Sequence, residues 1–258
     1  MPALPRNRLR LLPRGPLDAL RQLALFAAAY YAYRLVRGLV DTRASVAFEN
    51  ARVLVDAERA MGSFFEPGLQ AWALSQGWVV DAASWMYVNS HFTVTTTFLV
   101  WLYIARNSAF YYVRNMFMVA MGLALVGYVV FPTAPPRFLP EWGFTDTVAD
   151  FVGPAAEASA GVLYNPFAAV PSMHVAFALM IAVPGVVLSR RLVVKVIWAI
   201  YPVLVTLTVM ITGNHFWLDA FFGAAVAAVS AWAAHSAFGR ARPEVWSFRP
   251  PAAAEATV

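Results

Sequence analysis

The sequence contains no cysteine and little charge, since only 13% of its residues are Asp, Glu, Lys or Arg. Without cysteine, the chain has no disulfides, no thiolate nucleophiles and no cysteine-based zinc sites. A soluble domain carries about 25% charged residues, so the low charge argues against that class. The net charge is +5, and in a membrane protein Lys and Arg usually mark cytoplasmic loops. We therefore expect no nucleic-acid partner.

Apolar residues dominate instead. Of the 258 residues, 60% are hydrophobic, and the mean hydropathy is +0.60. Several apolar runs are long enough to cross a bilayer as helices, and they are continuous rather than alternating. The sequence shows neither an internal repeat nor a second domain. It predicts an all-α integral membrane protein, a six-transmembrane-helix bundle with additional interfacial amphipathic helices.

Prolines, glycines and charged residues divide these runs. The predicted spanning helices cover residues 17–39, 84–105, 115–131, 172–188, 192–212 and 216–238, with a short polar loop at 106–114 and a long loop at 132–171. Residues 45–62 carry Glu49, Arg52, Asp56 and Arg59 at three- and four-residue spacing opposite apolar positions. This pattern is typical of an amphipathic helix that lies flat at the membrane interface. Residues 67–80 are predicted to form a second interfacial or re-entrant helix.

The predicted organisation has three parts. Residues 1–16 are basic and broken by prolines, and no small-residue cleavage site follows the first apolar run, so the first helix is expected to be an uncleaved anchor. Residues 17–238 form the six-helix membrane domain. Residues 239–258, which are rich in proline and small residues, are expected to be a disordered cytoplasmic tail.

The distribution of cations predicts the orientation. Placing both termini in the cytoplasm puts most of the 19 Lys and Arg residues on that side. The same orientation brings three polar stretches to the extracytoplasmic face, namely residues 132–137, 171–174 and 213–219. The ends of the helices on either side of these stretches are therefore expected to converge on one site.

The residues gathered there suit phosphate-ester chemistry. They are a guanidinium (Arg137), a hydroxyl (Ser172), two imidazoles (His174 and His215) and a carboxylate (Asp219). A phosphate ester needs N–H and cationic donors on its oxygens, an in-line nucleophile and an acid for the leaving oxygen. On a helix, His215 and Asp219 would share one face, so that the carboxylate orients the imidazole.

Two of these residues fit phosphate binding in particular. Ser172 follows Pro171 at the expected start of a helix, an N-cap position. There its hydroxyl and the free N–H groups of the first turn would cradle an anion. Arg137 follows the stiff run Thr-Ala-Pro-Pro and would bind two oxygens at once.

Other classes of function remain open on these residues alone. His174, His215 and Asp219 could ligate zinc in a metal-dependent hydrolase, although Arg137 beside them would repel a cation. A non-catalytic membrane binding protein would have no need of the complete His-His-Asp set. A serine hydrolase fits poorly, because Ser172 and His174 are two residues apart on one helix and do not face each other.

Three motifs carry a family resemblance. Pro-Ser-Met-His at 171–174 and Gly-Asn-His-Phe-Trp-Leu-Asp-Ala-Phe-Phe-Gly at 213–223 resemble the second and third signature motifs of the phosphatidic acid phosphatase type 2 superfamily. Phe-Pro-Thr-Ala-Pro-Pro-Arg at 131–137 is similar to the first motif in the form used by the inositol phosphorylceramide synthase-like branch, as are residues 165–169. The resemblance extends over about residues 50–238 and fits the order of the six helices.

The resemblance implies a mechanism without a cofactor or metal. His215 would be the nucleophile and form a phosphohistidine, Asp219 would orient it, and His174 would protonate the leaving group. Arg137 and Ser172 would bind the phosphate. The implied partner is a lipid phosphate or phospholipid in the membrane, and the implied location is the plasma membrane or an endomembrane, with the site on the extracytoplasmic face.

The resemblance also leaves the acceptor open. A lipid or polyol hydroxyl would make the protein an inositol phosphorylceramide synthase-like lipid phosphotransferase, the function that the first motif favours. Water would make it a phosphatase of lipid phosphates or polyprenyl pyrophosphates. Two cations of the family's phosphatases are missing, because Val130 and Val209 stand at their positions. The candidates to replace them are Arg34, Arg37, Arg52 and Arg59.

Overall fold

A computed structural model describes residues 12–39, 43–153 and 167–238. Within these ranges the chain is helical, apart from turns, extended connections and an isolated bridge between Thr133 and Ala168. The all-α prediction is confirmed. The predictions for most of the basic N-terminal segment and for the tail after residue 238 lie outside the described residues.

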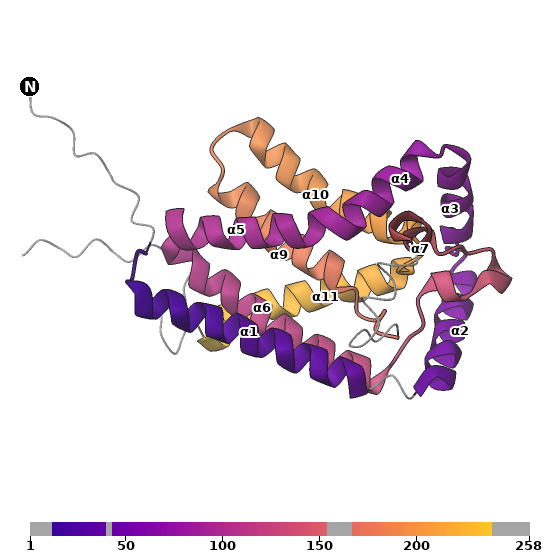
Figure 1. Ribbon diagram of the computed structural model, residues 1–258, viewed down its shortest axis with the longest axis horizontal. Helices are drawn as coiled ribbons and strands as arrows, with labels where there is room; N and C mark the ends of the chain where they lie inside the picture. Colours follow the sequence, from indigo (N-terminus) through magenta and orange to yellow (C-terminus); the bar gives the residue numbers. More distant parts are fainter. Residues whose placement is uncertain (1–11, 40–42, 154–166, 239–258) are drawn as a thin grey trace, which may run out of the picture.

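The helices pack as a bundle closed at one end by shorter helices (Figure 1). Helix α1 (Pro16–Leu39), α5 (His91–Ala105), α6 (Asn107–Val130) and α11 (Trp217–Ala233) run along the long axis of the view. Helix α9 (Met173–Leu188) packs against α6, α10 (Leu192–Ile211) and α11. Helices α2 (Ala44–Ala60), α3 (Glu66–Ser75) and α7 (Thr147–Val152) gather at the end where α1 finishes.

Three of the described helices are long and apolar enough to cross a membrane. They are Asn107–Val130, Leu192–Ile211 and Trp217–Ser236, the last including part of the terminal π-helix η5 (Ala234–Phe238). Helix α9 is also apolar but has 16 residues, about 24 Å at 1.5 Å per residue, whereas the hydrocarbon core is about 30 Å thick. The chain is therefore a multi-pass membrane protein, and the prediction of six spans stays a prediction.

The segment around residue 85 differs from the prediction. Helix α4 (Trp78–Trp85), the π-helix η2 (Met86–Ser90) and α5 follow one another without a break, so residues 78–105 form one interrupted helix. The predicted helix at 67–80 corresponds to α3 and the start of α4, divided at Gly77, whose φ of +52° lies in the left-handed region. A π-turn bends a helix locally, and it often occurs at functional sites.

The predicted loop at 106–114 is wrong, because α6 begins at Asn107. Arg114 lies buried inside α6, where its guanidinium donates to Gln22 Oε1 at 2.6 Å and to Asn115 Oδ1. Because these side chains accept its hydrogen bonds, the guanidinium can be buried in a helix and does not have to lie in a solvent-exposed loop. The prediction began the helix after Arg114 because this residue is charged. The real helix begins earlier, because Arg114 is buried inside it and hydrogen-bonded.

The amphipathic character of α2 is confirmed. Its apolar positions Ala47, Ala51, Leu54 and Val55 are buried, and Glu49, Arg52, Asp56 and Arg59 are exposed. The buried face packs on a small core that includes Leu139, Phe144 and Phe216. Helix α2 thus covers the connections between the ends of α6, α9 and α11. The same face also buries Glu58, which the amphipathic pattern did not predict.

Candidate active site

The three polar stretches predicted to converge do meet in the structure. Arg137 N–H donates to the Gly213 carbonyl at 2.7 Å, which joins the first stretch to the third. Ser172 N–H donates to the Asp219 carbonyl at 3.0 Å, which joins the second to the third. These backbone bonds fix the end of α6, the start of α9 and the α10–α11 connection against one another. The three stretches thus converge as predicted, and their position on the extracytoplasmic face stays a prediction.

His215 does not lie on a helix, contrary to the expectation that it shares a helical face with Asp219. It lies in the turn between α10 and α11, since α11 begins at Trp217. The N–H groups of Asn214 and His215 both donate to the Val209 carbonyl, at 2.9 and 3.1 Å. Gly213 makes the turn with a φ of +65°, which only glycine adopts readily.

The His215–Asp219 pair forms nevertheless. Nδ1 of His215 lies 3.2 Å from Oδ2 of Asp219, and the same oxygen accepts from the Phe216 N–H at 2.9 Å. His215 is 6% exposed and Asp219 is completely buried. With Nδ1 occupied by the carboxylate, Nε2 is the nitrogen of His215 that remains for chemistry.

His174, in the first turn of α9, is the next imidazole. Its ring centroid lies 5.7 Å from that of His215, with the planes at 61°. Two further rings flank it, Tyr87 at 4.8 Å and His91 at 4.7 Å. Tyr87 belongs to the π-turn and His91 follows it directly, so the interruption of the helix brings both rings against His174.

Ser172 occupies the N-cap of α9, as predicted, with φ −70° and ψ 105°. Its side chain does not cap the helix, and its completely buried Oγ has no hydrogen-bond partner among the described residues. Gly223 faces it, because a Cβ at residue 223 would collide with the Ser172 carbonyl oxygen. A buried hydroxyl with unused donor capacity is suited to binding an anion.

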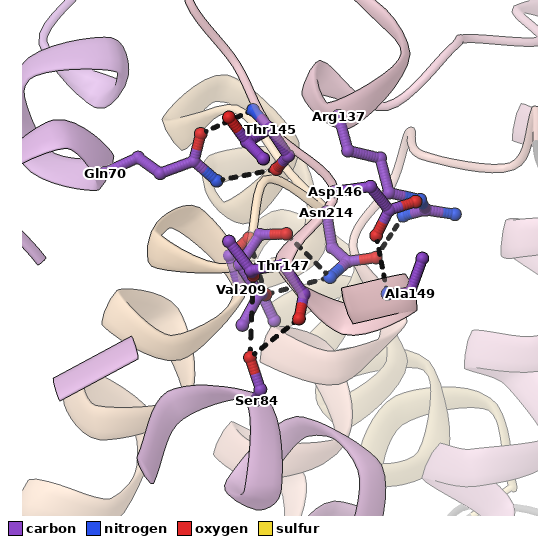
Figure 2. Close-up of polar contacts among 10 residues, drawn as sticks. Gln70, Ser84, Arg137, Thr145, Asp146, Thr147, Ala149, Val209 and Asn214 are labelled. Atoms are coloured by element: carbon purple, nitrogen blue, oxygen red, sulfur yellow. Dashed lines mark hydrogen bonds and ion pairs between the residues drawn. The ribbon is translucent and has the colours of Figure 1, made fainter. Parts of the chain in front are cut away.

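Arg137 is held beside the α10–α11 turn by its side chain as well as its backbone. The guanidinium donates to the side-chain oxygen of Asn214 and forms an ion pair with Asp146, with Nε 3.2 Å from Oδ2 (Figure 2). The arginine side chain is 7% exposed and that of Asp146 is 26% exposed. The guanidinium therefore already contacts an oxyanion, and a phosphate would have to compete with Asp146 for it.

The segment around Asp146 is clamped by side chains from distant helices, as Figure 2 shows. Gln70 of α3 donates to the carbonyls of Thr145 and Ile211, each at 3.0 Å, and accepts from the Thr145 N–H at 2.9 Å. Asp146 also caps α7 by accepting from the Ala149 N–H at 3.0 Å. Sequence reasoning missed Gln70, Asn214 and Asp146, although Asn214 stands next to His215.

The positions of the missing cations differ in environment. Val209 is 1% exposed and packs in the core, whereas Val130 is 74% exposed. Near Val130, Arg43 Nη1 donates to the Val129 carbonyl at 3.3 Å. Arg43 is thus a cation beside Val130. It was not among the replacements that the sequence suggested.

Of the four candidate replacements, two have side chains that the structure describes, Arg52 and Arg59. Arg59 lies over the rings of Phe64 and Trp142, at 5.0 and 5.6 Å from their centroids. Arg52 is exposed on the outer face of α2. The side chains of Arg34 and Arg37 lie outside the described part of the chain.

The geometry of the described residues does not support the alternative of a zinc-dependent hydrolase. Nowhere in residues 12–39, 43–153 and 167–238 do three or more His, Asp or Glu side chains gather in a way that could hold a metal ion. His174 and His215 are neighbours, but the nitrogen of His215 nearest to Asp219 is already bonded to that carboxylate. The described groups instead form a pair of imidazoles beside a carboxylate, a hydroxyl and a guanidinium.

Comparison with known proteins gives one match. The family model described as PAP2 superfamily matches residues 52–233, a range that contains all five candidate site residues. No curated protein and no solved structure matches the chain.

Proposed function

Because the chain belongs to the PAP2 superfamily, whose enzymes are lipid phosphatases and phosphotransferases, we propose that it transfers a phosphoryl group or phospho-headgroup from a membrane lipid through a phosphohistidine on His215. Membership makes the chain an enzyme of this class, with phosphate-containing lipids as substrates. The observation that carries the specific proposal is the contact of His215 Nδ1 with the buried Asp219.

That contact supports His215 as the nucleophile. A carboxylate at Nδ1 keeps the proton on that nitrogen, so that Nε2 carries the lone pair. In the first step the Nε2 lone pair attacks phosphorus, and the bond from phosphorus to the leaving oxygen breaks. His174 then supplies the proton to that oxygen. The ring of His174 lies next to that of His215, where an acid for this step is needed.

In the second step the acceptor replaces the histidine. A hydroxyl oxygen attacks phosphorus, the phosphorus–nitrogen bond breaks, and His174 takes the proton of that hydroxyl, which replaces the proton lost to the leaving group. His174 and His215 thus return to their starting states. The cycle therefore needs no resident metal or cofactor.

Phosphate binding is assigned to Ser172 and Arg137. Ser172 Oγ, which has no hydrogen-bond partner among the described residues, forms one set of donors together with the start of α9. Arg137 supplies the other set once phosphate displaces Asp146 from the guanidinium. A phosphoryl group carries more negative charge than one carboxylate, which favours this exchange.

The acceptor distinguishes two reactions. The first-motif form at 131–137 favours an alcohol, and with it an inositol phosphorylceramide synthase-like transferase. Water as acceptor gives the alternative, a phosphatase of lipid phosphates or polyprenyl pyrophosphates. In both cases residues 17–238 act as one membrane domain, with both termini in the cytoplasm and the site on the extracytoplasmic face.

The test uses purified full-length protein in detergent micelles. Phosphatidic acid, phosphatidylinositol and a polyprenyl pyrophosphate are supplied as separate donors, with and without inositol or ceramide as acceptor. We expect turnover that His215→Ala abolishes. His235→Ala, which changes an exposed histidine in η5, should leave turnover unchanged.

Three results would overturn parts of this proposal. Undiminished turnover by His215→Ala would remove the phosphohistidine. Phosphate release that is indifferent to every acceptor would remove the transferase in favour of the phosphatase. Loss of activity on chelation, restored by zinc, would favour the metal-dependent hydrolase, because the two-step reaction above requires no metal.

A further inference from the structure

Carboxyl groups from three helices bind the first turn of α11. Asp219 Oδ2 accepts from the Phe216 N–H at 2.9 Å, as described above. Glu66 Oε1, from α3, accepts from the Trp217 N–H at 2.7 Å, and Glu58 Oε1, from α2, accepts from the Leu218 N–H at 3.1 Å. The first N–H groups of a helix have no partner within it. Here three successive residues give theirs to three acidic side chains.

Glu58 and Glu66 are both completely buried. Glutamate is rarely found in that state without compensating bonds. Glu66 has such bonds, because its second oxygen accepts from the Phe65 N–H at 3.0 Å. Glu58 has fewer, since its Oε2 is buried and receives no hydrogen bond from a donor in the described ranges. That oxygen is therefore the place where a proton would be held.

The surroundings of Glu58 favour the protonated form. Burial, and after it the negative charge of Glu66, raise the pKa of Glu58 to about 9. The charge of Asp219 acts in the same direction, as does a hydrogen bond between the two glutamates. Burial also raises the pKa of Glu66. On α2 itself, the neighbouring Arg59 lies over Phe64 and Trp142.

Glu58 and Glu66 accept from N–H groups of successive residues, which brings the two carboxyls together at the start of α11. Two carboxyls can bond to each other only when one of them carries a proton. From this geometry we infer that Glu58 and Glu66 are positioning residues, which share a proton and hold the start of α11, and with it the His215–Asp219 pair, in its working position. They touch the backbone of the two residues between Phe216 and Asp219 rather than the reacting groups. Their effect on catalysis rests on the function proposed above, whereas their effect on α11 does not.

The N-termini of α9 and α11 therefore have different roles in the site. A helix N-terminus with free N–H groups attracts an anion. The start of α11 is occupied by carboxyls, so its N–H groups serve to fix Asp219. The start of α9 carries the Ser172 hydroxyl, which has no hydrogen-bond partner within the described ranges, and it is the start that we assign to the phosphate.

Loss of the shared proton should release this end of the site. A group whose pKa is raised on folding contributes stability at low pH, and this contribution is lost as the pH rises through the folded-state value. For Glu58 that value is about 9. Above it, two carboxylates would face each other next to Asp219, and the resulting repulsion would separate α2 and α3 from α11.

The experiment compares Glu58→Gln, Glu58→Ala and Glu66→Gln with the wild type between pH 6 and pH 10. Hydrogen exchange of the peptide that covers residues 216–223 is measured by mass spectrometry in detergent, and each rate is corrected with the unfolded peptide. Turnover of the donor identified above is measured in parallel. Glu49→Gln, on the exposed face of the same helix, is the matched control.

We expect wild type and Glu49→Gln to lose protection and kcat as the pH passes about 9. Glu58→Gln keeps an acceptor for Leu218 without an ionisable proton, so it should retain protection at high pH. At pH 7 its kcat should stay within about twofold of wild type. Glu58→Ala should lose protection at every pH and lower kcat by about tenfold or more, because it leaves a buried N–H unsatisfied.

Glu66→Gln provides the sharpest readout. It keeps the acceptor for Trp217 but removes one of the two carboxylates whose repulsion would separate the helices. The loss of protection at high pH should therefore become much smaller than in wild type. A merely structural glutamate would leave the high-pH loss unchanged.

The inference is overturned if Glu58→Gln or Glu66→Gln shows the same high-pH loss as wild type. Because hydrogen exchange needs no substrate, it separates the two hypotheses. The expected exchange pattern without any turnover would contradict the proposed function alone. Histidine-dependent turnover with a pH-independent exchange pattern would contradict the shared proton alone.

Discussion

At the scale of single residues, the candidate site combines side chains that have hydrogen-bond partners with side chains that lack them in the described ranges. His215 Nδ1 is bonded to Asp219 Oδ2, and Arg137 is bonded to Asn214 and Asp146. Ser172 differs, because its buried hydroxyl has no hydrogen-bond partner in the described ranges. An unused donor at a helix start next to two imidazoles indicates a function that requires a ligand.

Replacing Ser172 by alanine tests this interpretation. The change removes no hydrogen bond within the described part of the chain, so the thermal midpoint should stay within about 1 °C of wild type. A hydrogen bond to a charged group contributes about 1.5–3 kcal/mol, so kcat/KM should fall about ten- to hundredfold. Circular dichroism melting and initial rates in micelles measure the two effects.

Ser75→Ala is the control for this change, because it removes an exposed hydroxyl that bonds the Trp72 carbonyl. It should alter neither quantity. A Ser172→Ala protein that melts several degrees lower, with unchanged kcat/KM, would show that the hydroxyl serves the fold instead.

At the scale of helices, ends rather than faces build the site. The α10–α11 turn supplies His215, the first turn of α11 supplies Asp219, and the start of α9 supplies Ser172 and His174. The π-turn η2 adds Tyr87 and leads into His91, at the other side of His174. The spacing of these groups therefore depends on how closely α9 and α11 approach.

Gly223 sets that approach, and its replacement by alanine should separate the two helices. A Cβ there would collide with the carbonyl oxygen of Ser172, part of the backbone and unable to move aside cheaply. We expect a destabilisation of about 1–3 kcal/mol, as for other overpacked sites, together with a loss of most activity.

Gly122→Ala is the matched control, since Gly122 also lies inside a helix and a Cβ there would meet nothing within 4 Å. Alanine is the better helix former by about 1 kcal/mol, so this variant should be as stable as wild type or more so. The measurement is residual activity after heating. Equal behaviour of the two variants would contradict the close contact between α9 and α11.

At the scale of the whole molecule, apolar side chains lie outside as well as inside. Helix α10 exposes large apolar residues along its length, among them Leu192, Val193, Ile197, Ile200 and Val203. Of the residues in its most apolar 18-residue stretch, only 17% are buried within the protein. Such a surface would be costly in water, and it suits a helix that faces lipid.

The absence of cysteine allows a direct test of the orientation. A single cysteine at Glu141→Cys lies in the connection between α6 and α7 that also carries Arg137, and one at Arg190→Cys lies in the turn between α9 and α10; both positions are exposed. In intact cells a membrane-impermeant maleimide should label Glu141→Cys but not Arg190→Cys, and it should label both after lysis. The reverse pattern would place the site in the cytoplasm.

The sequence by itself determined the helical class, the boundaries of α9 and α10 to within one residue, and the five groups that the structure brings to one end of the bundle. Hydropathy and proline positions are local properties, so they can be read directly from the chain. The spacing of His215 and Asp219 predicted their contact correctly, although the predicted helical geometry was wrong. His215 reaches Asp219 from a turn rather than from a helix.

Only the tertiary structure decided which polar groups are partners. In the sequence Arg114 looked like a loop residue, and Glu58 was not singled out in the amphipathic pattern, but both are buried. The partners of Glu58 are Glu66 on α3 and an N–H group 160 residues away. Hydrogen bonding and desolvation depend on what the fold places around a group, and no local pattern contains that information.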